Sequence, residues 1–215
     1  MGTVAFSVTE TEIRNILNSK EFDTGGKWAA FPLNFANRVI RQIHMEMDIR
    51  AKLGNITATF TTSVTSITLG STYFKVSDRF TNARVAGVPV DIIPLEELNA
   101  LDRDHDDVST AAEPTAAAIE GTSVFVSPLW AGELIIENIF TKPTDMADNT
   151  ESPDLPDDDE AQDVIIAGVL SKCFKMLRQF DMAAAYRVDF FSFLDIYRNH
   201  IDKQNSMATS KSVFF

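Results

Sequence analysis

The sequence predicts an α+β protein in which helices from the N- and C-terminal parts form one bundle, with a β-strand insertion between them. Apolar residues recur at helical spacing before residue 55 and again after residue 159. The segment between them is rich in Thr, Val and Ile and contains repeated turn signals. Strands do not alternate with long helices, so a doubly wound parallel sheet is not expected.

The N-terminal segment, residues 1–55, is expected to hold two helices. Thr9 and Glu12 have the spacing of a capping box at the start of the first helix, and Gly25-Gly26 ends that region. Pro32 suits the first turn of the second helix, which the periodicity carries to about Lys52. Four cations lie off the apolar stripe and indicate a solvated face, with a DNA-facing surface as the alternative: Arg38, Arg41, Arg50 and Lys52.

Residues 56–144 form the predicted β-rich insertion. A strand region is expected over 56–69, a short strand over 73–76 and a longer strand over 133–141. Hairpins are expected over 84–93 and 115–127, with a short helix over 95–101.

Three further segments complete the chain. Residues 145–158 have the composition of an acidic linker. Residues 159–202 show the period of a helix pair, which we expect to share one bundle with 1–55. Residues 203–215 are expected to be a tail that is disordered or that orders on a partner.

Composition limits the function. With 45% hydrophobic and 23% charged residues, the 215-residue chain is typical of a globular protein and not of a disordered one. The net charge is −12, and nine acids without a Lys or Arg lie between Asp145 and Asp163, which leaves −3 for the remainder. This argues against a broad basic face that grips nucleic acid. No targeting signal or membrane span is recognised, so no membrane partner is expected.

Candidate chemistry is sparse. Asp102, Asp104, Asp106 and Glu113 match the acidic positions of an EF-hand calcium loop, but Asp107 replaces the required Gly and Pro114 follows at once. A solvated acidic loop is therefore preferred, and a calcium-dependent binding module stays as an alternative.

No other pattern suggests catalysis. Cys173, the single cysteine, lies in an apolar helical pattern and is expected to be a small core residue in a reducing compartment. His44 and His200 are expected at the surface or at the edge of a helix stripe. We find no catalytic motif and expect no enzymatic activity, metal or cofactor.

Several segments of the chain resemble tailed-phage head-to-tail connector (portal adaptor) proteins. Ile93–Leu98 contains the family's proline-leucine-glutamate-glutamate step, and Ala117–Pro128 is similar to its alanine-isoleucine-x-glycine turn with a following strand and proline. Glu133–Pro143 is similar to the long strand that ends in Lys-Pro. The resemblance covers residues 56 to 202, with Ala117 standing where the family commonly has an aromatic residue.

The resemblance implies a structural virion protein of the neck. Members form a homo-oligomeric ring, of twelve subunits to match the portal, that docks on the portal protein and offers its other face to tail or nozzle proteins. DNA passes through the bore without specific binding, which suits a negatively charged subunit. The subunits would be made in the host cytoplasm, and a tail-completion protein is the alternative from the same machine.

Two sets of contact residues are predicted on this basis. Val188 and Phe191 are apolar residues beyond the needs of one core, and we assign them to the subunit interface. The portal contact is assigned to the end of the tail: Lys211, Val213, Phe214 and Phe215.

Overall fold

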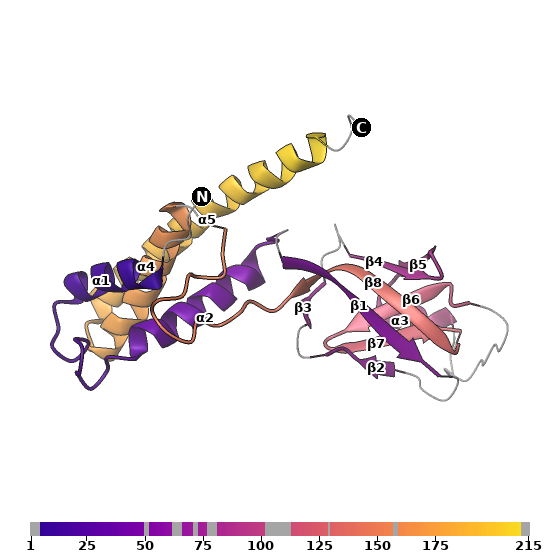
Figure 1. Cartoon of the computed structure of the whole chain (residues 1–215), viewed down its shortest axis with the longest axis horizontal. Coiled ribbons are helices and arrows are strands. Elements are labelled where there is room, and N and C mark those ends of the chain that lie inside the picture. The colour runs from indigo at the N-terminus through magenta and orange to yellow at the C-terminus, as the bar shows by residue number, and fades with distance from the viewer. Residues whose placement is uncertain are drawn as a thin grey trace. The chain divides into compact units, whose positions relative to one another are not determined.

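The chain folds into two compact units, which we call the helical unit (Met1–Ile49 with Pro143–Phe215) and the β unit (Arg50–Lys142). Their elements are shown in Figure 1, a computed structural model. The predicted mixed α and β class is confirmed. The structure describes residues 5–49, 52–61, 66–70, 73–76, 81–101, 113–128, 130–156 and 159–211.

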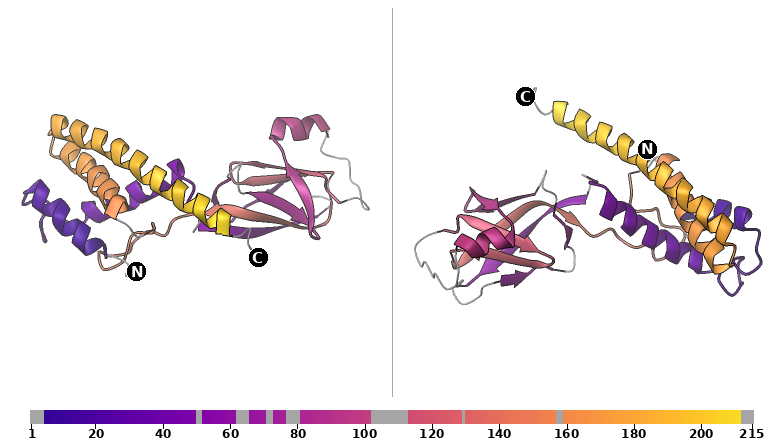
Figure 2. Two further views of the ribbon diagram at one scale, coloured as in Figure 1. Left: turned by 90° about the horizontal axis from the view of Figure 1, so that it is seen from above. Right: turned by 180° about the vertical axis from the view of Figure 1, so that it is seen from behind.

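Four helices build the helical unit: α1 (Phe6–Leu17), α2 (Phe31–Glu46), α4 (Asp159–Met176) and α5 (Phe180–Lys211). The other three helices pack on α4 (Figure 2). Side chains of α4 are buried over much of its circumference. One core takes side chains from all four helices, including Phe6, Ile43, Leu170 and Tyr197. Among the described helices, none combines the length and hydropathy that a bilayer span requires.

The start of α1 differs from the expected capping box. The helix begins at Phe6, and Thr9 lies inside it with only 2% of its surface exposed. The first free N–H groups, of Phe6 and Ser7, donate to the carbonyls of Glu151 and Asn149 at 2.9 and 2.7 Å. A distant loop therefore caps the helix, so no side-chain cap is needed.

Helix α2 ends at Glu46, earlier than the expected Lys52. The backbone is extended at Met47, and both Met47 and Ile49 are buried while Asp48 between them is partly exposed. The spacing between buried apolar residues thus changes from three or four positions in the helix to two positions here, which favours an extended chain over a helix.

The turn between α4 and α5 has the geometry of a Schellman motif. Arg178 occupies the left-handed position with φ of 58°. The N–H of Gln179 donates to the Phe174 carbonyl at 3.0 Å, and that of Arg178 to the Lys175 carbonyl at 3.2 Å. Both bonds satisfy carbonyls at the end of α4, so the chain can reverse without glycine.

Helix α5 is longer than expected. It continues from the predicted end near residue 202 to Lys211, so most of the expected tail is helical. Nothing between Phe180 and Lys211 interrupts it, because this span contains neither Gly nor Pro.

The β unit contains eight described strands in the order β1-β8-β4-β5-β6-β7-β2, with β3 paired to β8. The ends of this path, β1 and β2, approach each other, so the sheet is nearly closed. Both expected hairpins are confirmed, β4–β5 and β6–β7. The strands are β1 (Leu53–Phe60), β2 (Ser66–Thr68), β3 (Tyr73–Lys75), β4 (Asn82–Val85), β5 (Val88–Ile92), β6 (Ala116–Glu120), β7 (Ser123–Ser127) and β8 (Gly132–Thr141).

Local chemistry explains the β-unit connections. Ala86 and Gly87 both have positive φ, as a tight two-residue hairpin turn requires. Helix α3 (Leu95–Leu101) lies on the connection between β5 and β6, which pair in parallel and so cannot be joined by a tight turn. The core of this unit is separate and includes Val124, Leu134 and Ile136.

Residues 143–156, most of which were expected to be a linker, are fixed to the helical unit. The Asn37 side chain donates to the Met146 carbonyl and accepts from the Met146 N–H, both at 3.0 Å. Arg41 forms an ion pair with Asp145. His44, expected at the surface or at the edge of the helix stripe, is buried, and its Nε2 lies 2.7 Å from the Asp154 carbonyl oxygen.

The acids of this segment also serve its own backbone. Asp154 accepts from the Thr144 N–H at 2.6 Å, and Glu151 accepts from the Ala147 N–H at 2.7 Å. Hydrogen bonds from Thr150 lower the pKa of Asp148. The Asp, Asn, Ser and Pro content that is typical of linkers is equally typical of such ordered turns.

Candidate functional site

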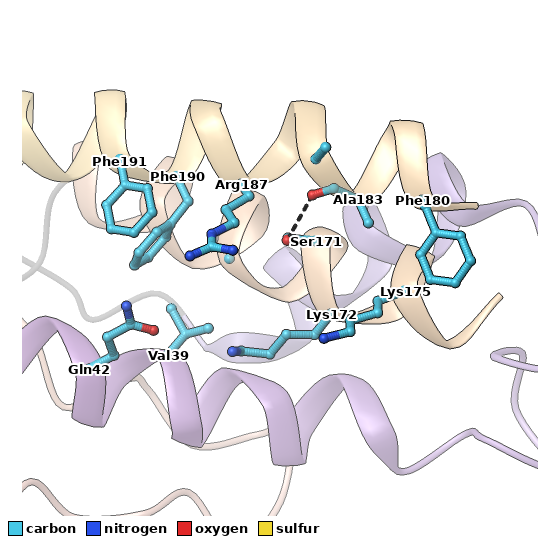
Figure 3. Close-up of a pocket in the computed structure, with 12 residues that line it drawn as sticks. Val39, Gln42, Ser171, Lys172, Lys175, Phe180, Ala183, Arg187, Phe190 and Phe191 are labelled. Atoms are coloured by element: carbon cyan, nitrogen blue, oxygen red, sulfur yellow. Dashed lines mark hydrogen bonds between the residues drawn. The ribbon is translucent and has the colours of Figure 1, made fainter. Parts of the chain in front are cut away.

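A groove of about 440 Å³ on the helical unit runs between α2 and α5, with α4 as its floor (Figure 3). All three helices contribute side chains, so the groove exists only in the folded unit. Its lining residues are Val39, Gln42, Gly168, Ser171, Lys172, Lys175, Phe180, Ala183, Ala184, Arg187, Phe190 and Phe191.

Small residues on α4 bring the helices close together at the floor. A Cβ atom on Gly168 would lie 2.8 Å from Val39 Cγ2 and 3.0 Å from Phe190 Cδ2. The Ser171 hydroxyl donates to the Ala183 carbonyl at 2.9 Å and links α4 to α5 (Figure 3). The groove walls are therefore fixed by packing and by a hydrogen bond.

Positive charge is concentrated at this groove. Lys172, Lys175 and Arg187 line it, and no acidic side chain is among its lining residues. Burial lowers the pKa of Lys172, and the nearby charges of Arg38, Lys175 and Arg187 lower it further. Crowded like charges cost free energy, so an anionic group in the groove would relieve the repulsion.

Aromatic surface lies beside these cations. The rings of Phe190 and Phe191 meet edge to face with centroids 5.2 Å apart, and the Arg187 guanidinium carbon lies 5.9 Å from the Phe191 centroid. Phe180, at the other end, is 64% exposed. The groove thus combines apolar and cationic contacts, which suits a protein segment with apolar and acidic side chains.

The predicted interface residues both lie on α5. Val188 is 66% exposed and Phe191 is 43% exposed, and Phe191 lines the groove while Val188 is not among the lining residues. Lys211 is the last residue of α5. Val213, Phe214 and Phe215 lie outside the described residues, and their assignment stays a prediction.

Most residues of the calcium hypothesis lie in a part of the chain that the structure does not describe. Asp102, Asp104 and Asp106 lie outside the described residues, and Glu113 is exposed. Within the described ranges, no group of three or more His, Cys, Asp or Glu side chains could hold a metal ion.

Two other singled-out side chains have structural surroundings. Cys173 is buried in the core of the helical unit, and burial raises its pKa to about 12, so its thiol is a weak nucleophile at neutral pH. His200 is partly exposed, with its Nδ1 3.8 Å from a Glu160 carboxylate oxygen.

Sequence reasoning did not identify Lys172, Lys175, Phe180 or Arg187 as a group. The available signal was two lysines interrupting the apolar pattern of α4 and surplus apolar residues on two sides of α5. These four residues converge because α5 packs against α4, and the opposite wall of the groove comes from α2, which ends more than 110 residues before α4 begins.

Comparison with known proteins gives one family. The model of the family described as SU10 adaptor protein matches residues 8–211, nearly the whole chain. No curated protein matches.

Proposed function

The chain belongs to the SU10 adaptor protein family, and from this premise we propose that it forms the adaptor ring between the portal and the tail of a phage. The family itself identifies a phage structural adaptor and a virion component of the neck. In our proposal, twelve subunits form a ring that docks on the portal protein, receives tail or nozzle proteins on its other face and encloses part of the DNA channel.

The family match over residues 8–211 carries this proposal. The helical unit adds support, because large apolar side chains remain exposed along α5, including Val188, Phe191 and Ile196. A subunit that contacts neighbours needs such surface, whereas an isolated globular protein does not. The long α4–α5 pair also favours the adaptor over a tail-completion protein.

The charge supports a channel that does not grip DNA. The chain carries a net charge of −12, so its overall charge does not attract the phosphate groups of DNA. We accordingly propose a structural role in DNA ejection without catalysis.

Native mass spectrometry tests the proposal. The protein is measured alone and mixed with the portal protein encoded in the same phage genome. We expect one ring-sized complex that contains portal and twelve adaptor subunits. A chain that stays monomeric and ignores the portal would contradict the proposed function.

A truncation tests the predicted portal contact. Removing residues 207–215 should leave the fold unchanged, because the described core side chains end at Ile201. Portal binding should weaken. Unchanged portal affinity, measured by the same mass titration, would remove Lys211, Val213, Phe214 and Phe215 from the contact.

A further inference from the structure

Two surfaces of the helical unit are complementary: their charges are opposite, both contain exposed apolar side chains, and their lengths are similar. The first is the groove between α2 and α5. The second, which we call the α1 face, is the side of α1 that points away from the core: Val8, Thr11, Glu12, Asn15 and Ile16.

The α1 face is apolar and acidic. Val8 is 59% exposed and Ile16 is 38% exposed, and Glu12 lies one helical turn from each. No cation belongs to this face. The loop that caps the helix adds an exposed acidic residue, Asp148, whose neighbour Asn149 accepts from the Ser7 N–H in the first turn at 2.7 Å.

The groove provides the complementary chemistry. Its exposed cations, Lys175 and Arg187, can face carboxylates, and the exposed Phe180 and Phe191 rings can cover aliphatic side chains. Along α5, Phe180 and Phe191 are about 16 Å apart, and Val8 and Ile16 on α1 are about 12 Å apart. The apolar stripe of α1 is therefore shorter than the line of α5 between these two phenylalanines.

Each copy can use both surfaces at once. The groove takes no residue from α1, and α1 packs into its own core through Phe6, Ile13 and Leu17. Contacts between two different patches join copies head to tail, and such contacts close into rings when the rotation between copies permits.

We infer that the α1 face of one copy docks into the groove between α2 and α5 of the next copy. This inference rests on the proposed function, because it assigns the contact that would hold neighbouring ring subunits together. It also divides the predicted interface residues, since Phe191 lies inside this contact while Val188 is not among the groove residues.

A charge exchange between two variants tests the inference. The groove variant carries Lys175→Glu and Arg187→Glu, and the α1-face variant carries Glu12→Lys and Asn15→Lys. All four side chains are exposed, so the fold should be retained, and circular dichroism checks this. A control variant, Lys20→Glu with Lys27→Glu, makes the same charge change as the groove variant at exposed lysines outside both surfaces.

Native mass spectrometry with the portal protein present gives the readout. Each variant alone should lose the ring-sized species, because like charges then face each other. An equimolar mixture should restore it with equal numbers of both chains, since the groove of each variant then meets an α1 face of opposite charge. The control variant should form the ring like the wild type.

Other outcomes contradict the inference. Rings formed by either variant alone would overturn this contact and leave the proposed function standing. Failure of the mixture to restore the ring would show that the groove receives a different partner. Failure of the wild type to assemble would contradict the proposed function together with this contact.

Discussion

Arg178 has an unusual backbone conformation for a residue with a large side chain. Its φ of 58° lies in the left-handed region, where a Cβ atom crowds the following carbonyl. The Schellman hydrogen bonds to Lys175 and Phe174 fix it there. The turn between α4 and α5 is therefore formed at a cost in backbone strain.

Glycine at this position should stabilise the protein. We expect Arg178→Gly to raise the free energy of unfolding by about 1 kcal/mol, because glycine adopts the left-handed region freely. Urea denaturation followed by circular dichroism measures the change. Arg178→Ala is the matched control, since it removes the charge but keeps Cβ, and an equal gain in that variant would contradict the strain argument.

Cys173 should make the stability fall at alkaline pH. Burial raises its pKa from 9.0 to about 12, so above pH 9 the unfolded chain loses this proton before the folded chain does. The neutral thiol contributes fully to the free energy of unfolding below pH 9, and this contribution is lost as the pH rises from 9 toward 12.

The variant Cys173→Ala removes this titration. Between pH 8 and pH 10, the wild type should lose about 1.4 kcal/mol more unfolding free energy than the variant. Chemical denaturation at both pH values measures the difference, and parallel losses in the two proteins would show that the thiol ionises equally in both states.

At the scale of elements, the segment 143–156 is a structural part of the helical unit. Both hydrogen-bonding groups of the Met146 backbone are paired with the side chain of Asn37. Met146 is 4% exposed, so its backbone groups have little access to water if the side-chain amide of Asn37 is removed.

Removing the side-chain amide of Asn37 should release the segment 143–156 from α2. We expect Asn37→Ala to lower the free energy of unfolding by about 2 to 4 kcal/mol, because two part-buried backbone groups lose their partner. Asn34→Ala, at an exposed position of the same helix, is the control and should change stability little. Hydrogen exchange at residues 144–151 should rise only in the Asn37 variant, and equal exchange in both would argue against the clamp.

Local patterns predict the type of most elements in this chain but not where they end. The hairpin at Ala86–Gly87 follows from its turn residues, and the helical period of α4 and α5 is unambiguous. The start of α1 was misplaced because its cap is a loop about 140 residues away. The residues around the start of α1 carry no information about a capping loop that is so distant in the sequence.

The groove was missed for a related reason. Phe191 was recognised as surplus to the core, whereas its neighbours Lys172 and Lys175 are ordinary exposed-type residues in the sequence. The two lysines form a site only where the packing of three helices brings them together with other cations. Burial and these neighbouring charges then lower the pKa of Lys172.

At the scale of the whole molecule, the two units have separate cores. The β unit is entered through β1 and left through β8, which pair in antiparallel register with Leu53 opposite Phe140. The Thr141 hydroxyl donates to the Lys52 carbonyl at 3.1 Å next to this pair. The two chain connections thus leave the β unit side by side.

The β unit should therefore fold by itself. A fragment of residues 50–142 should show a dispersed amide NMR spectrum whose peaks overlay those of the same residues in the full protein. Its own core and the pairing of its first and last strands provide the stability. A collapsed spectrum would mean that the helical unit is required for its folding.

The insertion of the β unit also sets the order of events on the ribosome. Helices α1 and α2 are made first, but α4, the helix on which both pack, follows only after the 93 residues of the β unit. From the end of α2 at Glu46 to the end of α4 at Met176 the chain grows by 176 − 46 = 130 residues. At translation rates of about 5 to 20 residues per second, the apolar sides of α1 and α2 therefore lack that partner for roughly 7 to 26 s. The strands have all their own partners once β8 emerges, so the middle of the chain can reach its native structure before the beginning does.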